Sequence, residues 1–150
     1  MRDHFVDQAY IDHFRREHSR IHQAVRDVEH ELHLAATSRD DERVATRLTQ
    51  LRQTLARHFN DEDEGGCIEE AISRCPSLSR EAVLVEKEHP MLLQLIDRLI
   101  ERARSGFVGC ATDDFVESFR RFAKTLHAHE AAENSILERA FGTAAYEEAG

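Results

Sequence analysis

The chain has 150 residues, of which 41% are hydrophobic and 33% charged, with two prolines, six glycines and no tryptophan. This length suits a single domain with a core large enough to fold without disulfides, and the composition favours long helices over a strand-and-turn fold. The net charge of −9 argues against a nucleic-acid partner, because binding a phosphate backbone needs a basic face.

The N-terminus has no apolar run behind basic residues, and no stretch of 18 apolar residues occurs anywhere. We therefore expect no signal peptide and no membrane partner, with a cytoplasmic location as the default. Cys67, Cys75 and Cys110 are odd in number and lack Cys-x-x-Cys spacing, so they predict neither a disulfide framework nor a zinc ribbon. Reduced thiols are expected, with a redox-responsive Cys67–Cys75 pair as the alternative.

Apolar residues at steps of three and four predict the first two helices. Residues 1–13 form a leading arm or a short helix, and the first strong helix follows the apolar stripe over 14–32, ending near 37–41. The second helix has the same spacing of predicted buried positions over 44–62, and Gly65-Gly66 is predicted to end this helix.

The same rhythm predicts a third helix over 85–103, with Pro90 inside, and a fourth over 115–140, with Thr112 as its N-cap. A connector over 67–79 contains a short helical piece at 68–72. Because the other connections are short, we predict an all-α, antiparallel up-down-up-down four-helix bundle with an N-terminal arm. It forms one domain over 1–150, with its core at about 14–141.

An internal duplication relates two histidines and one glutamate of the first half to two histidines and one glutamate of the second half, at an offset of 71 residues. The apolar residues around them recur at the same offset. Each half contains His-x-x-x-Glu, which on a helix places an imidazole and a carboxylate one turn apart on the same face. These residues occupy core positions, where each unpartnered polar group costs about 1–3 kcal/mol. The six metal-ligand candidates are His18, His58, Glu62, His89, His129 and Glu133.

The predicted hairpins bring the four histidines to one level of the bundle. In an antiparallel pair, two residues are level when the turn lies midway between them, and the midpoints of successive histidines are residue 38, residues 73–74 and residue 109. All three midpoints fall in predicted connections. The two glutamates should follow one turn away, about 5–6 Å.

Four imidazoles and two carboxylates fit iron or manganese better than a structural zinc site, which would use cysteines or four ligands in total. If each carboxylate bridges two metals and each metal takes two histidines, both ions keep open positions. We therefore predict two Fe ions with an oxo or hydroxo bridge, replaceable by Mn or Zn, and O2, NO or peroxide as the small ligand.

Four motifs cover about 14–137: Glu17-His18-x-x-Ile21, Leu55-x-x-His58-Phe59-x-x-Glu62, Glu88-His89-x-x-Leu92 and Leu126-x-x-His129-x-x-x-Glu133. Their order and spacing resemble the hemerythrin-like, HHE cation-binding domains. The resemblance implies a four-helix bundle around a carboxylate-bridged, non-haem di-iron centre. It also implies a role in O2 binding, oxygen or iron sensing, NO and peroxide handling, or iron-sulfur repair.

The chain departs from the oxygen carriers of that family at two positions. They carry His-x-x-x-His in the third helix, whereas Leu93 follows His89 by four residues here. They carry His-x-x-x-x-Asp in the fourth helix, whereas Asn134 stands at that place, one residue after Glu133. Because 93 − 71 = 22, the mirror position is His22, which is a candidate fifth histidine ligand that would make the two metals unequal.

Other polar residues have plainer interpretations. Tyr10 and His13 are candidates to cover the mouth of the site and tune bound ligands, with edge packing as the alternative. His127 and Glu130 fall off the core stripe and are predicted to lie on a solvated face. Glu86-x-x-His89 has the spacing of ferritin-like di-iron proteins, but a single copy disfavours that class.

The leading hypothesis is a di-iron protein that binds a small ligand in oxygen sensing or in the oxidative or nitrosative stress response. One alternative is a redox enzyme that reduces NO or peroxide, served by a redox partner protein. Another is an iron-delivery or iron-sulfur repair module with labile iron. A metal-free helical bundle is the simplest alternative to all three.

Overall fold

The computed structural model describes residues 2–38, 41–65, 67–105 and 113–142, and every regular element in these ranges is helical. The all-α prediction is therefore confirmed for this part of the chain. The long helices are α1 (Arg2–Ser38), α2 (Asp41–Gly65), α4 (Ser79–Arg104) and α5 (Asp113–Leu137). The short elements are α3 (Cys67–Arg74), a 3-10 turn η1 (Pro76–Leu78) and a π-helical turn η2 (Glu138–Gly142).

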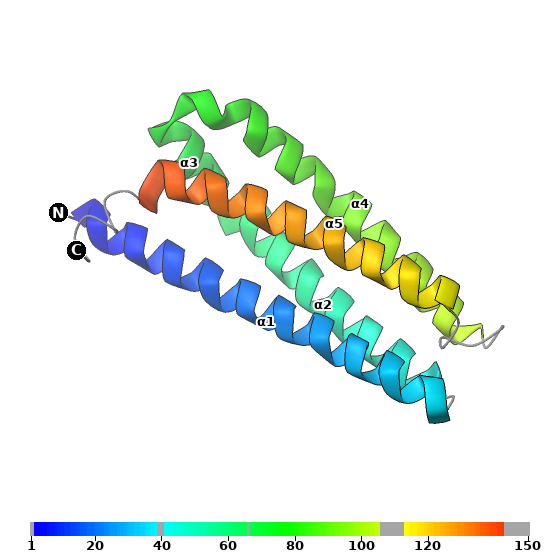
Figure 1. Ribbon diagram of the computed structural model, residues 1–150. Coiled ribbons are helices and arrows are strands. Elements are labelled where there is room, and N and C mark those ends of the chain that lie inside the picture. The colour runs from blue at the N-terminus through cyan, green and yellow to red at the C-terminus, as the bar shows by residue number, and fades with distance from the viewer. Residues whose placement is uncertain (1, 39–40, 66, 106–112, 143–150) are drawn as a thin grey trace.

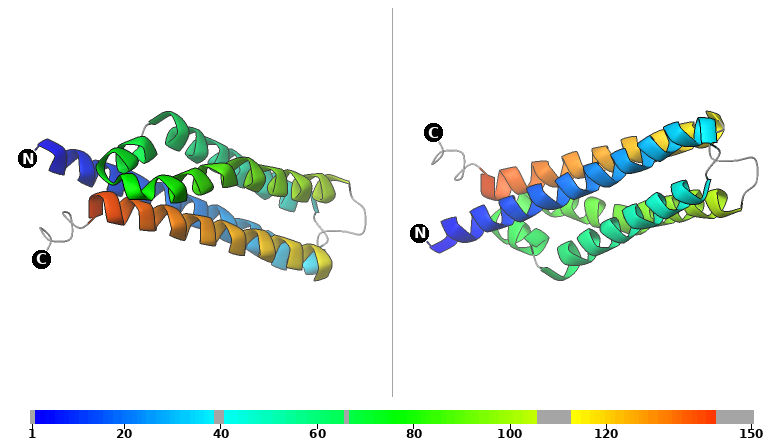
Figure 2. Two further views of the ribbon diagram at one scale, coloured as in Figure 1. Left: turned by 90° about the horizontal axis from the view of Figure 1, so that it is seen from above. Right: turned by 90° about the horizontal axis from the view of Figure 1, so that it is seen from below.

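The four long helices lie side by side, and the chain direction alternates from one to the next (Figures 1 and 2). α1 packs against α2, α2 against α4, α4 against α5, and α5 against α1, so the four surround a shared interior. α3 lies at one end of this assembly and contacts α2, α4, α5 and η2. The arrangement is compatible with the predicted four-helix bundle.

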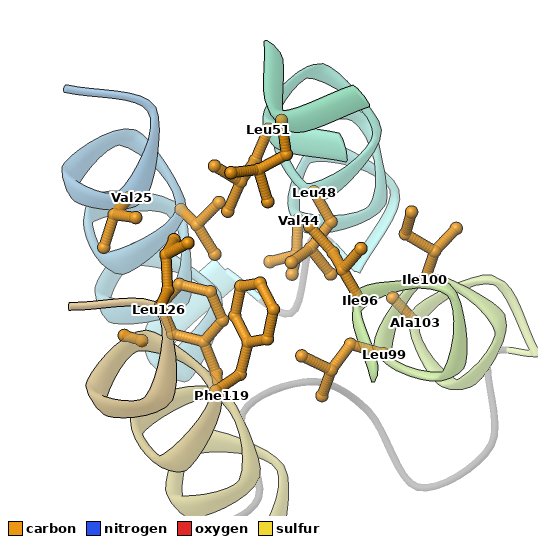
Figure 3. Close-up of a cluster of buried hydrophobic side chains, with 14 of the residues drawn as sticks. Val25, Val44, Leu48, Leu51, Ile96, Leu99, Ile100, Ala103, Phe119 and Leu126 are labelled. Carbon is orange, nitrogen blue, oxygen red and sulfur yellow. The ribbon is translucent and has the colours of Figure 1, made fainter. Parts of the chain in front are cut away.

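Two apolar clusters fill the interior at different levels. The larger cluster takes side chains from all four long helices, and Figure 3 shows Leu51, Ile96 and Phe119 directed into one shared space. The smaller cluster lies toward α3 and includes Phe14, Ile68, Val85, Ile136 and Phe141. Burial of these apolar side chains is the main stabilising contribution to the fold.

Two ends of the predicted helices differ from the structure. Residues 2–13 form no separate arm but are the first turns of α1, and Tyr10 and Ile11 pack partly buried against the smaller cluster. α5 ends at Leu137, and the chain continues as η2, whose wider turn brings Phe141 into the core at 2% exposure.

The short helical piece predicted at 68–72 is present as α3, and α4 continues through Pro90, which is exposed. The predicted caps at residues 39–40 and Thr112, and the turn around residue 109, lie outside the described residues.

Cys75 is a free, half-buried thiol. Among the described helices, none combines the length and the apolar character needed to cross a membrane.

Candidate metal centre

A layer of buried polar side chains separates the two apolar clusters. On α1, His18 stands between Phe14 of the smaller cluster and Ile21 of the larger one, and on α4, His89 stands in the same way between Val85 and Leu92. α2 and α5 each add one histidine and one glutamate to this layer. The members are His18, His58, Glu62, His89, His129 and Glu133, and none exposes more than 6% of its surface.

These six residues form two overlapping groups of potential metal ligands. One group contains His18 and His58, the other contains His89 and His129, and both contain Glu62 and Glu133. Within each group, one ligand atom from every residue lies within 4.8 Å of the others. Two adjacent four-donor clusters that share two carboxylates are the arrangement expected around a pair of bridged cations.

Each glutamate reaches histidines of both groups. Glu62 contacts His58 on its own helix, and its Oε2 atom lies 3.1 Å from His89 Nε2 on α4. Glu133 contacts His129 on its own helix, and its Oε2 atom lies 3.5 Å from His58 Nε2. The same oxygen lies 3.7 Å from His18 Nε2. Both carboxylates therefore lie between the two histidine pairs.

The converging atoms are near one another but are not aligned for hydrogen bonding. Within the described residues, no hydrogen-bond partner is present for either oxygen of Glu62 and Glu133 or for Nε2 of all four histidines. Each such buried atom costs about 1–3 kcal/mol when unsatisfied. A cation placed among the lone pairs would satisfy them together, so the donor set fits a metal better than it fits an empty polar core.

The electrostatics of the layer are those of closely coupled charges. Burial opposes protonation of His58, but the neighbouring carboxylates of Glu133 and Glu62 outweigh burial and raise the pKa of His58 to about 10. Burial likewise opposes protonation of His129, and Glu133 raises its pKa above the usual value. In the absence of metal, protons therefore take the place of cations on these imidazoles.

The pKa values of the two glutamates are shifted in opposite directions. Burial raises the pKa of Glu62, although His58 and His89 partly oppose the rise. Burial also acts to raise the pKa of Glu133, but interactions with His129, His18 and His58 dominate and hold that pKa well below its usual value.

The outer nitrogens of the histidines have unequal partners. His129 Nδ1 donates to Glu88 Oε1 at 3.3 Å, and His89 Nδ1 lies 3.3 Å from Asp63 Oδ1. Neither His58 Nδ1 nor His89 Nδ1 has a hydrogen-bond partner among the described residues, so the contact between His89 and Asp63 is electrostatic and not an aligned hydrogen bond. Carboxylates behind metal-binding imidazoles orient the ring and raise its basicity. Glu88 gives His129 this support through a hydrogen bond, and Asp63 lies near His89 without one.

A surface pocket of about 490 Å³ reaches the other half of the layer. His58 and Glu62 form its inner wall, so the pocket joins the layer to the surface beside α1 and α2. Tyr10 and His13, the two residues expected near the mouth of the site, both line it. The remaining lining residues are Phe14, Asp61 and Glu64.

His22 lies outside the six-residue layer, in a separate group with His127 and Glu130. The prediction that Glu130 is solvated is wrong, because its side chain faces α1 and only 4% of the residue is exposed. The duplication could have predicted this burial, because the position 71 residues before Glu130 is Phe59, which is a core residue. His127 is exposed, as expected, and so is Glu86 of the ferritin-like spacing.

The buried His/Glu groups could hold metal ions. In comparisons with known proteins, no family model, no curated protein and no solved structure matches the chain.

Proposed function

We propose that this protein is a hemerythrin-like, up-down-up-down four-helix bundle that holds two iron ions and binds O2, NO or peroxide, in oxygen sensing or in the response to oxidative or nitrosative stress. The observation that supports this most strongly is the sharing of Glu62 and Glu133 by two four-donor groups in a buried layer.

In this proposal His18 and His58 would hold one ion, and His89 and His129 the other. Glu62 and Glu133 would bridge them, because each glutamate already contacts histidines of both pairs. Mixed imidazole and carboxylate donors suit iron or manganese, and zinc can replace either. Bound iron would supply redox activity and open coordination positions for a small ligand.

The protein would give the two ions different environments. Glu88 and Asp63 stand behind the histidines of one pair, whereas the pocket opens beside the other pair at His58. We therefore expect the small ligand to arrive on the His18–His58 side. Tyr10 and His13 line that route and would offer a hydroxyl and an imidazole as hydrogen-bond donors.

Apolar packing on two sides of the layer supports the same role. The small apolar cluster with Phe14, Val85 and Ile136 covers the layer on one side, and the larger cluster with Ile21, Leu92 and Leu126 covers the other. Access is thus concentrated at the pocket mouth. A small uncharged molecule such as O2 or NO could enter, whereas a bulky reductant would have to transfer electrons from outside.

The test is to purify the protein without oxygen, count its metals and record absorption spectra before and after adding O2, NO or peroxide. A stable new band after O2 or NO, reversed by removing the gas, supports ligand binding. Steady consumption of NO or peroxide with an electron donor would instead make the protein a redox enzyme. Rapid loss of iron to a chelator without unfolding would indicate an iron-delivery module. The Glu86→Ala variant serves as a control, because Glu86 is exposed on α4, and its absorption spectra should match those of the wild type.

A further inference from the structure

A second group of potential ligands lies between α1 and α5, outside the buried layer. His22 Nε2 donates to Glu130 Oε2 at 2.6 Å, and the rings of His22 and His127 lie 5.1 Å apart. One ligand atom from each of the three residues lies within 4.8 Å of the others. His127 and Glu130 are three residues apart on α5, which places them on adjacent turns of one helix face.

Glu130 is unusual for a residue that pairs with a surface histidine. Its side chain is only 5% exposed, and its second oxygen, Oε1, is buried without a hydrogen-bond partner among the described residues. One imidazole N–H satisfies one oxygen and leaves the lone pairs of the other oxygen without a donor. A buried carboxylate of this kind is stabilised by a further donor or cation close to it, and the ligand atoms of His22 and His127 lie within 4.8 Å of one of its own.

The duplication shows that the fold does not require polar residues here. The positions related to His22 and Glu130 by the offset of 71 residues are Leu93 and Phe59. Phe59 is buried and Leu93 packs against the same apolar cluster, so the other half of the molecule fills this place with hydrocarbon. A buried carboxylate and two imidazoles thus replace an apolar contact in one half only.

We propose that His22, His127 and Glu130 form a separate mononuclear site for a divalent transition-metal ion of the zinc class. Two imidazoles and one carboxylate are a common donor set for such ions, with the remaining position left to water. Donors at zinc bond lengths and tetrahedral angles lie about 3.4 Å apart. In this structure the ligand atoms of the three residues are separated by distances from 2.6 Å to at most 4.8 Å, a range that includes this value.

The ion at this site would exchange readily with solvent. The His22 side chain is 40% exposed and His127 is exposed, so water can reach the ion from the surface. The buried layer shares none of these three residues. The two sites can therefore be emptied independently by substitution, and the inference does not depend on the identity of the metal in the buried layer.

The experiment is a Zn²⁺ titration by calorimetry on protein whose buried layer has been loaded beforehand and whose metal content has been counted. We expect one additional equivalent in the wild type and its loss in His127→Gln. His127 is exposed, so this substitution should leave folding intact. His30→Gln, which replaces an exposed histidine further along α1, should keep the additional equivalent.

Glu130→Gln provides a second test, because it keeps the size of the buried side chain and removes its charge. It should also abolish the additional equivalent, with the helical circular dichroism unchanged. Absence of the additional equivalent in the wild type, or its persistence in His127→Gln, would overturn the proposal. Glu62→Ala separates the two sites: it should empty the buried layer and still bind the zinc that depends on His127.

Discussion

The phenyl ring of Phe59 stacks on the imidazole of His89, with ring centroids 4.2 Å apart and planes within 6° of parallel. The same ring meets His129 nearly edge-on at 5.5 Å and lies 5.9 Å from His58. One buried aromatic residue of α2 therefore contacts three of the four histidines. Phe59 joins the larger apolar cluster to the polar layer and restricts the rotamers of the imidazoles.

Phe59→Ala should destabilise the metal-free protein by about 3–5 kcal/mol, because it opens a cavity between the cluster and the histidines. Denaturant unfolding of chelator-treated protein measures this change. Leu84→Ala is the control, since Leu84 is 57% exposed, and it should cost no more than about 0.5 kcal/mol. Equal costs for the two substitutions would contradict the role given to Phe59.

Glu88→Gln should weaken metal binding by about 10- to 100-fold, because it weakens the hydrogen bond that orients His129. The measurement is competition with a chelator of known affinity. Glu86→Gln changes an exposed glutamate two residues away and should leave the affinity unchanged. If both variants hold metal as tightly as the wild type, Glu88 does not support the centre.

The metal-free protein should become less stable as the pH rises from about 6.5 toward about 10. The pKa of His58 is raised from 6.5 to about 10, so its stabilising contribution is complete below pH 6.5 and is lost as the pH passes through the folded-state pKa. The contribution is on the order of a few kcal/mol. Urea unfolding across this range measures it, and His58→Gln should remove most of the decline.

The same protons must leave when metal binds, because the ligand is the neutral imidazole. Metal affinity should therefore rise with pH over the window in which stability falls. Calorimetric titration in buffers of different ionisation enthalpy would detect the released protons. Uptake of metal without proton release would show that His58 is not a ligand.

Tyr10→Phe should leave the metal content unchanged and speed the release of NO. Tyr10 lines the pocket beside His58 and also packs on Phe141, with ring centroids 5.7 Å apart, so the ring is retained while the hydroxyl is lost. A hydrogen bond worth about 0.5–1.5 kcal/mol corresponds to roughly 2- to 13-fold faster dissociation. Stopped-flow release of NO measures it, and an unchanged rate would place Tyr10 outside ligand binding.

The sequence predicted the long helices well because their buried faces follow one simple spacing. Phe14, His18 and Ile21 lie on one stripe of α1, and the structure buries all three. The positions of the four histidines also indicated that they share a level, because the predicted connections fall midway between successive histidines. Their role as metal ligands stays a prediction.

The flanks of the helices were harder to predict because burial there depends on the neighbouring helix. Glu130 lies off the stripe of α5 and is buried only because that side faces α1 and His22. The continuation of α1 through residues 2–13 likewise brings Tyr10 and Ile11 against the smaller cluster. A helical period calculated within one segment contains no information about them.

The most direct test of the dinuclear centre is elemental analysis of wild-type protein and Glu133→Ala, both purified without any chelator and supplied with iron during expression. We expect about two iron ions per wild-type chain, one for each overlapping group of donors, and a loss of both in the variant. A wild-type protein with fully folded helices and no bound metal, or a Glu133→Ala variant with undiminished metal content, would contradict it.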